Sequence, residues 1–350
     1  MIVAVVVAVV VPARVAGAQT AVAAAWVVVD ADAGRVIESV NGRTPLPPAS
    51  LTKVITALTV VRALPPSATV PVSGRAAAMP PSKVGMKAGQ QWRLDDAMHA
   101  LLLSSANDAA MALAERVSGS AEAFSAAQRA TAAQLGMRDS PVLHDPAGLD
   151  GPHGLGGGNL VSAEDLAIAA RAALAEPRIA PLLSTREYRF TAPDGRPRRL
   201  VNHNRLLWSY PGANGVKTGY TRRAGHCLSA AARRDGRAVL AVVLQAQDVY
   251  PTTAALLDAG FAAPPPAPAA GQASGRRSAA LPLPAPLPAP PSVPLPTLPP
   301  LLPGAMAGLP SGGRLSAATA VLALGGVATG SGRALRRRHR PAPASSGAHQ

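Results

Sequence analysis

β-Strand patterns stand at both ends of one long stretch of this chain. Residues 26–30 (WVVVD) are an apolar run followed by a turn, which predicts a strand with a hairpin partner at 35–38. Near the other end, residues 227–232 and 238–245 are apolar runs on either side of an Arg-Arg-Asp-Gly turn. Because helical patterns fill the sequence between these ends, one sheet has to join them. This order predicts an α+β domain with an antiparallel sheet flanked by helices.

Helical periodicity occupies the middle of the chain. A helix is expected from residue 50 to about residue 64, where two prolines end the pattern. Residues 94–117 are rich in Ala, Leu and Met and predict helices that are interrupted near Ser105. Further helices are expected at 120–135, 162–176 and 252–261.

The composition changes after residue 262. Residues 263–313 are dominated by Pro, Ala and Leu, which predicts a semi-rigid polyproline linker. Residues 314–333 enclose eighteen uncharged residues and predict a transmembrane helix. The arginines in 334–350 predict a basic tail that stays in the cytoplasm.

The first residues have the pattern of an export signal. Residues 2–11 are an unbroken apolar run, and small residues follow at 16–18. The run departs from the usual pattern because no Lys or Arg precedes it. We therefore expect a signal peptide at 1–18, or an uncleaved anchor, and a globular domain at 19–262. The domain would lie on the extracytoplasmic face of the cell membrane, held there by the C-terminal helix.

The formal net charge of +15 is unevenly distributed. All acidic residues fall between Asp30 and Asp258, so the cations beyond residue 262 have no acidic partner in that part of the sequence. The basic tail carries no aromatic residues and no recognised motif, which argues against a nucleic-acid partner. The single cysteine, Cys227, has no partner for an intramolecular disulfide, and its apolar surroundings predict a small buried residue on a strand.

Only four lysines occur among 350 residues, against thirty arginines. Lys53 closes the tetrad Ser50-Leu51-Thr52-Lys53, and a retained lysine suggests a task that a guanidinium cannot perform, such as losing a proton near neutral pH. A serine hydroxyl is a poor nucleophile until a base removes its proton. Ser50 is therefore the expected nucleophile, and Lys53, three residues later on the same helix face, is the expected base.

Two further motifs follow in order along the chain. Ser105 and Asn107 form a Ser-x-Asn motif, in which Ser105 would relay a proton to the leaving amine and Asn107 would position Lys53 and the substrate. Lys217 begins a Lys-Thr-Gly motif on a predicted strand. The remaining substrate-binding candidates are Thr218, Gly219 and Tyr220.

The Lys-Thr-Gly motif predicts how a substrate would bind. Lys217 and the Thr218 hydroxyl can hold a substrate carboxylate, and Gly219 would let a substrate backbone approach closely. The backbone N–H groups of Ser50 and Tyr220 are the expected oxyanion hole.

The ordered set of Ser-x-x-Lys, Ser-x-Asn and Lys-Thr-Gly is typical of penicillin-binding proteins and class A β-lactamases. Together with the flanking residues at 48–53, 101–110, 204–207, 215–221 and 224–228, this set resembles the D-alanyl-D-alanine carboxypeptidase family, the low-molecular-mass penicillin-binding proteins of serine peptidase type. The resemblance covers about residues 24–261.

This resemblance implies a fold like that of serine β-lactamases and penicillin-binding proteins, with a helical subdomain beside the sheet. It implies a catalytic domain that removes the terminal D-Ala from peptidoglycan stem peptides through an acyl-enzyme, without a cofactor or a metal. β-Lactam antibiotics would be covalent inhibitors. Two departures from the family pattern are Ala106, where Gly is common, and the Pro-rich segment, where many members have a further all-β domain and an amphipathic anchor.

Several other functions use the same or neighbouring residues. A D,D-endopeptidase that cleaves peptidoglycan crosslinks would use the same machinery. A class A-like β-lactamase needs a carboxylate to activate water, and Glu164 is the acidic residue in the right region. His144, Asp145 and His153 cluster in a loop without the ligand spacing of a zinc site. An inactive envelope-binding module would be expected to lack the serine or the lysine, and both are present.

Overall fold

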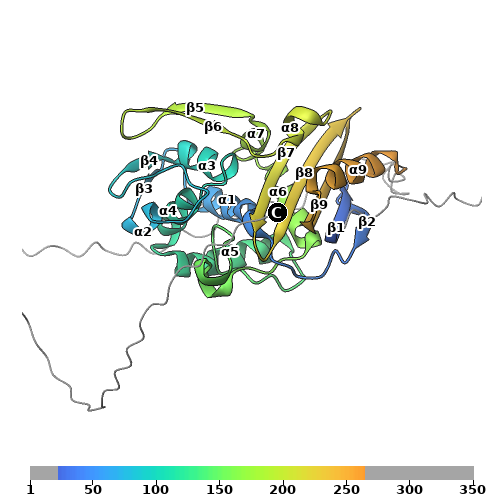
Figure 1. Ribbon diagram of the computed structural model, residues 1–350, viewed down its shortest axis with the longest axis horizontal. Helices are drawn as coiled ribbons and strands as arrows, with labels where there is room; N and C mark the ends of the chain where they lie inside the picture. Colours follow the sequence, from blue (N-terminus) through green and yellow to red (C-terminus); the bar gives the residue numbers. More distant parts are fainter. Residues whose placement is uncertain (1–22, 265–350) are drawn as a thin grey trace, which may run out of the picture. The chain divides into compact units, whose positions relative to one another are not determined.

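A five-stranded antiparallel sheet joins the two ends of the domain in the computed structural model, which describes residues 23–264 (Figure 1). The strands are β1 (Ala23–Asp30), β2 (Arg35–Val40), β7 (Ala213–Thr221), β8 (Gly225–Arg234) and β9 (Arg237–Ala246). Their order is β2-β1-β9-β8-β7, and each neighbouring pair is antiparallel. The pairing of β1 with β9 confirms that the sheet connects the two ends of the predicted domain.

Helices cover both faces of this sheet (Figure 1). Along β9, Leu240 and Val242 belong to the main core, whereas Val239 and Val243 belong to a second core beneath α9 (Val249–Ala262). This alternation follows from the two-residue period of a strand. Because both faces are covered, β9 reads as an almost continuous apolar run.

A helical layer lies beside the sheet, as the fold class predicted. Its longer members are α1 (Thr52–Ala63), α3 (Leu94–Leu102), α4 (Asn107–Ser118), α5 (Ala121–Leu135) and α6 (Ala163–Ala175). The shorter ones are α2 (Gly74–Ala77), α7 (Ala180–Ser184), α8 (Leu206–Ser209), and the 3-10 turns η1 (Ala49–Leu51), η2 (Gly151–His153) and η3 (Leu155–Gly157). The expected break near Ser105 is the connection between α3 and α4.

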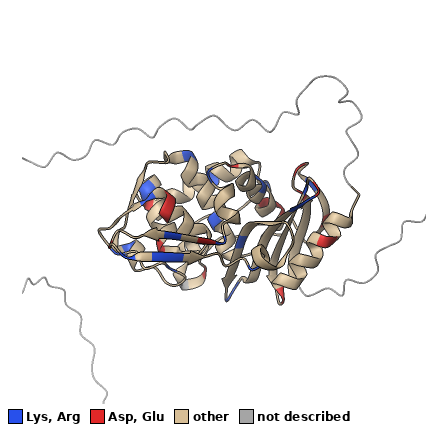
Figure 2. Cartoon of the chain, turned by 90° about the horizontal axis from the view of Figure 1, so that it is seen from above, with Lys and Arg blue, Asp and Glu red and all other residues tan. Residues whose placement is uncertain are grey.

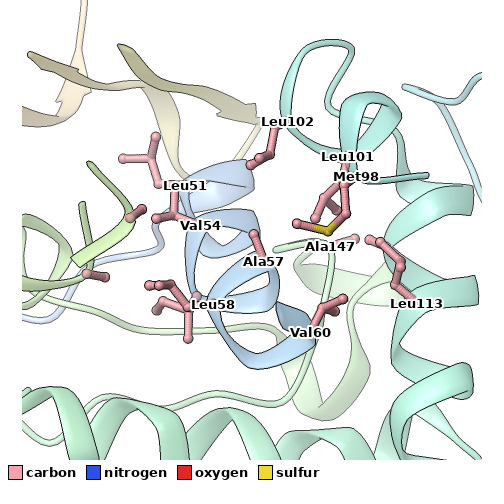
Figure 3. Packing of buried hydrophobic residues seen from close by; sticks show 14 of the residues in the cluster. Leu51, Val54, Ala57, Leu58, Val60, Met98, Leu101, Leu102, Leu113 and Ala147 are labelled. Atoms are coloured by element: carbon pink, nitrogen blue, oxygen red, sulfur yellow. The ribbon is translucent and has the colours of Figure 1, made fainter. Parts of the chain in front are cut away.

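Helix α1 is buried on all sides. Every residue from Thr52 to Val60 is buried, including Lys53. Figure 3 shows Val54 and Leu58 on one side of α1, with Leu101 of α3 and Leu113 of α4 on the other. A helix that is apolar nearly all round requires neighbours on every side. The first turn of α1 therefore has a fixed position relative to α3, α4 and the sheet.

Some boundaries differ from the sequence prediction. The helix expected from residue 50 begins at Thr52, because Ser50 lies in the preceding turn η1. Helix α9 begins at Val249, three residues before the expected start, since Pro251 is tolerated in a first helical turn.

Two small two-stranded sheets were not expected from the sequence. Strands β3 (Thr69–Pro71) and β4 (Gln91–Arg93) form one, and β5 (Glu187–Thr191) and β6 (Pro197–Val201) form the other. The strands of the first are only three residues long, too short to show an alternating pattern, and β6 begins with a proline and two arginines.

The predicted signal peptide, transmembrane helix and basic tail lie outside the described residues, as does nearly all of the linker. Within residues 23–264, no helix is both long enough and apolar enough to cross a membrane.

The close packing of α9 against the sheet leads to a prediction about stability. A Cβ built on Gly260 would lie 2.5 Å from a Val239 methyl and 2.8 Å from a Val28 methyl. Gly260→Ala should therefore lower the free energy of unfolding by about 1–2 kcal/mol in urea titrations, because the clash with two buried strand residues outweighs the better helix propensity of Ala. Gly74→Ala, with nothing within 4 Å of its Cβ, is the control and should be neutral or slightly stabilising. Equal effects of the two substitutions would contradict the packing argument.

Candidate active site

The three sequence motifs meet at one pocket of about 350 Å³. Ser50 reaches it from the turn before α1, and Ser105 and Asn107 from the junction of α3 and α4. Strand β7 contributes Thr218, Gly219 and Tyr220 to the wall of the pocket. Residues far apart in the sequence thus converge at one pocket. Lys53 and Lys217 are buried beside this pocket rather than among the residues that line it.

The Lys53 amine lies at the centre of the hydrogen-bond network. Its Nζ is 2.8 Å from Ser50 Oγ, 2.8 Å from Asn107 Oδ1 and 2.6 Å from the Ala147 carbonyl oxygen. Burial lowers the pKa of Lys53 from 10.5 to about 7, although the carboxylates of Asp145 and Asp108 act in the opposite direction. A substantial fraction of this amine is therefore neutral near pH 7.

The geometry of a neutral amine suits a base at this position. A neutral –NH₂ group has two N–H donors and one lone pair. The oxygens of Asn107 and Ala147 can accept only, so they take the two N–H groups. The lone pair is then left for the hydroxyl proton of Ser50. This arrangement can remove a proton from Ser50 without any side-chain movement.

Asn107 is held in place by the segment that forms one wall of the pocket. Its side-chain N–H donates to the Pro80 carbonyl at 3.0 Å, and its backbone N–H donates to the Ser82 carbonyl at 2.7 Å. The neighbouring Asp108 accepts the backbone N–H groups of Val84, Gly85 and Met86. The role of Asp108 was missed in the sequence, because its partners lie more than twenty residues earlier along the chain.

A second loop presents the Ala147 carbonyl to Lys53. The buried carboxylate of Asp145 accepts the backbone N–H groups of Ala147, Leu149 and Leu155 at 2.8–3.1 Å. Asn159 closes the loop, because its side chain accepts the N–H of Asp145 and donates to the Asp145 carbonyl. Sequence reasoning treated Asp145 only as part of a histidine-containing loop cluster.

Strand β7 lies directly against the turn that carries Ser50. A Cβ on Gly219 would lie 3.1 Å from the Pro48 carbonyl oxygen and 3.1 Å from the Ser50 backbone nitrogen. A side chain at Gly219 would therefore crowd this turn, so glycine favours the close approach of two parts of the chain itself. The Ser50 and Tyr220 backbones, predicted to hold an oxyanion, accordingly lie at adjoining walls of the pocket.

Lys217 and Tyr220, both on β7, differ in the exposure of their side chains. The Lys217 amine is buried and donates to the Thr218 carbonyl at 3.1 Å. Burial and the nearby Lys53 hold the pKa of Lys217 well below its usual range. The Tyr220 side chain is 59% exposed, and its ring lies 4.6 Å from that of His226 on β8. A ligand carboxylate near Lys217 would favour the ammonium form and so raise this lowered pKa, whereas the exposed Tyr220 side chain can contact a ligand directly.

The residues that the alternative functions would use lack the environment that those functions need. Glu164, in the first turn of α6, accepts a hydrogen bond from Ser39 at 3.0 Å and does not line the pocket. Asp145 is occupied by three backbone N–H groups, and residues 23–264 contain no cluster of three metal-ligating side chains. Cys227 lines the pocket from β8, as a buried strand residue, and burial raises the pKa of its thiol to about 11. A thiolate nucleophile is therefore disfavoured.

Comparison with known proteins places this geometry in a family. Residues 13–248 match peptidase family S11, described as D-alanyl-D-alanine carboxypeptidase. The chain belongs to this family. The family resemblance inferred from the motifs is thus confirmed, and so is the α+β fold of penicillin-binding proteins.

Individual relatives agree with the family match. The D-alanyl-D-alanine carboxypeptidase DacF of Bacillus subtilis is 34% identical over 225 residues, which are 63% of this chain and 56% of that protein. DacB2 of Mycobacterium tuberculosis is 35% identical over 248 residues, 69% of this chain and 83% of that protein. A crystal structure of a D-alanyl-D-alanine carboxypeptidase from M. tuberculosis superposes with a TM-score of 0.65 at 35% identity, covering 69% of this chain and 92% of the other. The chain therefore spans only just over half of DacF but most of DacB2.

The Asp145 loop gives a prediction about protonation. In the wild-type protein, the Lys53 ammonium should titrate with a midpoint near pH 7. Asp145→Asn removes a negative charge that favours the ammonium, so the midpoint should move to lower pH. The measurement is an NMR titration of ¹³C-labelled lysine, in which only four side chains contribute signals.

Two further variants control this titration. Lys53→Met identifies the signal by its loss, and Asp194→Asn, on the surface hairpin β5–β6, should leave the midpoint unchanged. A midpoint that stays constant or rises in Asp145→Asn would contradict the proposed electrostatic coupling.

Proposed function

We propose that this protein is a serine-type D-Ala-D-Ala carboxypeptidase that removes the terminal D-Ala from peptidoglycan stem peptides. The observation that carries the proposal is the Ser50 hydroxyl, 2.8 Å from a buried lysine amine whose pKa is about 7, at the edge of the pocket. The family to which the chain belongs supplies the reaction type.

Acylation follows from the arrangement around Lys53. The neutral Lys53 amine takes the hydroxyl proton as Ser50 Oγ attacks the carbonyl carbon of the scissile peptide bond. The oxygen of the tetrahedral intermediate accepts the backbone N–H groups of Ser50 and Tyr220. When the C–N bond breaks, the leaving D-Ala amine receives a proton through Ser105, and Asn107 keeps Lys53 in position. Water then attacks the carbonyl carbon of the acyl-serine ester while Lys53 takes a proton from it. The bond from that carbon to Ser50 Oγ breaks, Lys53 returns the proton to Ser50 Oγ, and the shortened peptide leaves as a carboxylic acid that ionises in water.

The charge of the pocket suits a substrate that ends in a carboxylate. Within the described part of the chain, the pocket is lined without any Asp or Glu, and two lysines are buried beside it. Thr218 places a hydroxyl on the wall, and a bound carboxylate would favour the ammonium form of Lys217 behind β7. A carboxylate that approaches the two buried lysines would offset part of the desolvation that disfavours their ammonium forms.

β-Lactams should react with the same serine, because they present a strained amide and a carboxylate to the same groups. Slow hydrolysis of the adduct is expected, since Glu164 lies away from the pocket and does not offer a carboxylate to a deacylating water. Rapid turnover of a chromogenic cephalosporin would instead support the β-lactamase alternative.

A labelling experiment tests the proposed nucleophile and base. Wild-type protein should form a stable covalent adduct with a fluorescent penicillin and release D-Ala from a soluble pentapeptide. Ser50→Ala should abolish both, and Lys53→Arg should reduce both by at least about a hundredfold, because a guanidinium stays charged at neutral pH. The exposed Lys87→Arg is the matched control and should behave like the wild type. Intact mass and D-Ala release are the measurements.

The outcomes separate the alternatives. An adduct on Ser50 with cleavage of crosslinked dimers, but without D-Ala release from pentapeptide, would favour the endopeptidase. A correctly folded wild type that forms no adduct would favour the inactive envelope-binding module.

We also propose that the domain is exported and anchored by residues 314–333. Support comes from the apolar run at 2–11, the uncharged segment before the arginine cluster, and membership of a family of cell-wall enzymes. The linker at 263–313 would then hold the catalytic domain at a distance from the membrane.

Cell fractionation tests this anchoring. The full chain should sediment with membranes, whereas a chain ending at residue 264 should appear in the soluble extracytoplasmic fraction. Deletion of 265–310 alone is the control and should leave the chain in the membrane. If the chain ending at 264 also sediments with membranes, the N-terminal run rather than 314–333 is the anchor.

A further inference from the structure

The hairpin β5–β6 carries a concentration of arginine outside the catalytic pocket. Residues 186–199 contain five arginines and two acidic residues, a net charge of +3. In Figure 2 the blue segments of this hairpin lie side by side. None of the residues from 186 to 201 lines the catalytic pocket. The charge of the hairpin therefore has no part in the proposed chemistry at Ser50.

The pairing of the strands brings two like charges together. Arg189 of β5 lies directly opposite Arg199 of β6, and both are exposed. Side chains directly opposite on one face of an antiparallel pair lie about 5 Å apart at Cβ, and like charges there are destabilising. Glu187 offsets part of this repulsion, and a bound anion between the two guanidinium groups would offset more of it.

A shallow hollow of about 420 Å³ lies at the same place. Its wall includes Arg189, Arg198 and Arg199, together with Phe190, Thr191 and Pro197. The Nε of Arg198 is buried and has no hydrogen-bond partner among residues 23–264. Strand alternation turns Arg198 toward the inner face with Phe190, so the hollow offers an anion the two outer guanidinium groups, those of Arg189 and Arg199.

The acidic residues of the hairpin pair closely with only some of its arginines. Glu187 accepts two hydrogen bonds from Arg199, and Asp194 pairs with Arg198 at 3.0 Å. Arg189 is left with one distant contact, 3.9 Å from Glu187, and its side chain is 75% exposed. The Glu187 carboxylate shows that an oxyanion fits against this pair of arginines.

The hairpin β5–β6 is held in place by packing contacts on its inner face. Its inner face places Tyr188 against the ring of His99, with centroids 3.6 Å apart, and Phe190 against Trp92 at 5.5 Å. The Tyr188 hydroxyl also donates to Asp96 at 2.8 Å. These contacts fix the positions of the outward-facing arginines, so a ligand would meet a preorganised surface.

We propose that the hollow beside Arg189 and Arg199 binds phosphate groups of an anionic polymer. The planar fork of a guanidinium makes paired hydrogen bonds to an oxyanion, and a tetrahedral phosphate has enough oxygens to bridge two forks at once. A lipid surface fits less well, because the outer face of the hairpin has no aromatic or large apolar side chain apart from Val201. Binding here would concentrate the enzyme on a polymer and leave the catalytic pocket free.

A binding titration tests the proposal on the purified full-length chain. The probe is fluorescently labelled linear polyphosphate, followed by anisotropy at several salt concentrations. Arg189→Gln/Arg199→Gln should weaken binding about tenfold or more and lower the slope of log K against log salt by about 1–2, because two phosphate contacts are lost. Arg189→Lys/Arg199→Lys keeps the charge but not the forks and should fall between these values.

Matched controls exclude a general effect of charge, including that of the basic tail. Arg35→Gln/Arg138→Gln removes the same charge from exposed positions elsewhere and should bind within about twofold of the wild type. Penicillin labelling should be equal in all variants, which would show that the active site is intact in each. A change in polyphosphate binding can then be interpreted whether or not the proposed peptidase activity is correct. Equal losses in the hairpin and control variants, or no binding by the wild type, would overturn the proposal. Binding of polyglutamate as tight as that of polyphosphate would overturn its assignment to phosphate.

Discussion

The burial of one amine, that of Lys53, is the constraint around which the site is organised. Moving its pKa from 10.5 to about 7 corresponds to roughly 5 kcal/mol of disfavour for the ammonium form. Helix α1 provides this desolvation, because every residue from Thr52 to Val60 is buried. The Asn107 and Ala147 oxygens supply the acceptors without which a buried amine would be unsatisfied. Burial and hydrogen bonding together keep Lys53 close to the point of losing a proton.

The surrounding loops are best understood as supports for those two acceptors. Asp108 ties the segment that holds Asn107, and Asp145 ties the loop that presents the Ala147 carbonyl. Each carboxylate satisfies several backbone N–H groups that a loop would otherwise bury without partners. Each also raises the pKa of Lys53 and so limits the effect of desolvation. Each of these two carboxylates thereby stabilises a loop and also affects the pKa of the Lys53 amine.

The contribution of the sequence was uneven in a physically understandable way. The central sheet, the long helices and the residues of the three motifs followed from periodicity, turn residues and spacing, all of which are local. The two-stranded sheets β3–β4 and β5–β6 did not, since their strands are short or begin with proline and arginine. Asp108 and Asp145 were missed as supports because an isolated aspartate in a sequence carries no sign of which distant N–H groups it will accept.

The sequence by itself determined which residues have the chemistry of the site and in what order they occur. Ser50, Lys53, Ser105, Asn107 and the motif at 217–219 are recognisable without coordinates, because their reactivity and spacing are properties of the chain. Only the tertiary structure decided the protonation of Lys53, the withdrawal of Lys217 behind the pocket wall, and the opposition of Arg189 and Arg199. These properties depend on burial and on distances between segments remote in the sequence. Both are set when the helices close around α1 and the strands pair, and no local pattern contains them.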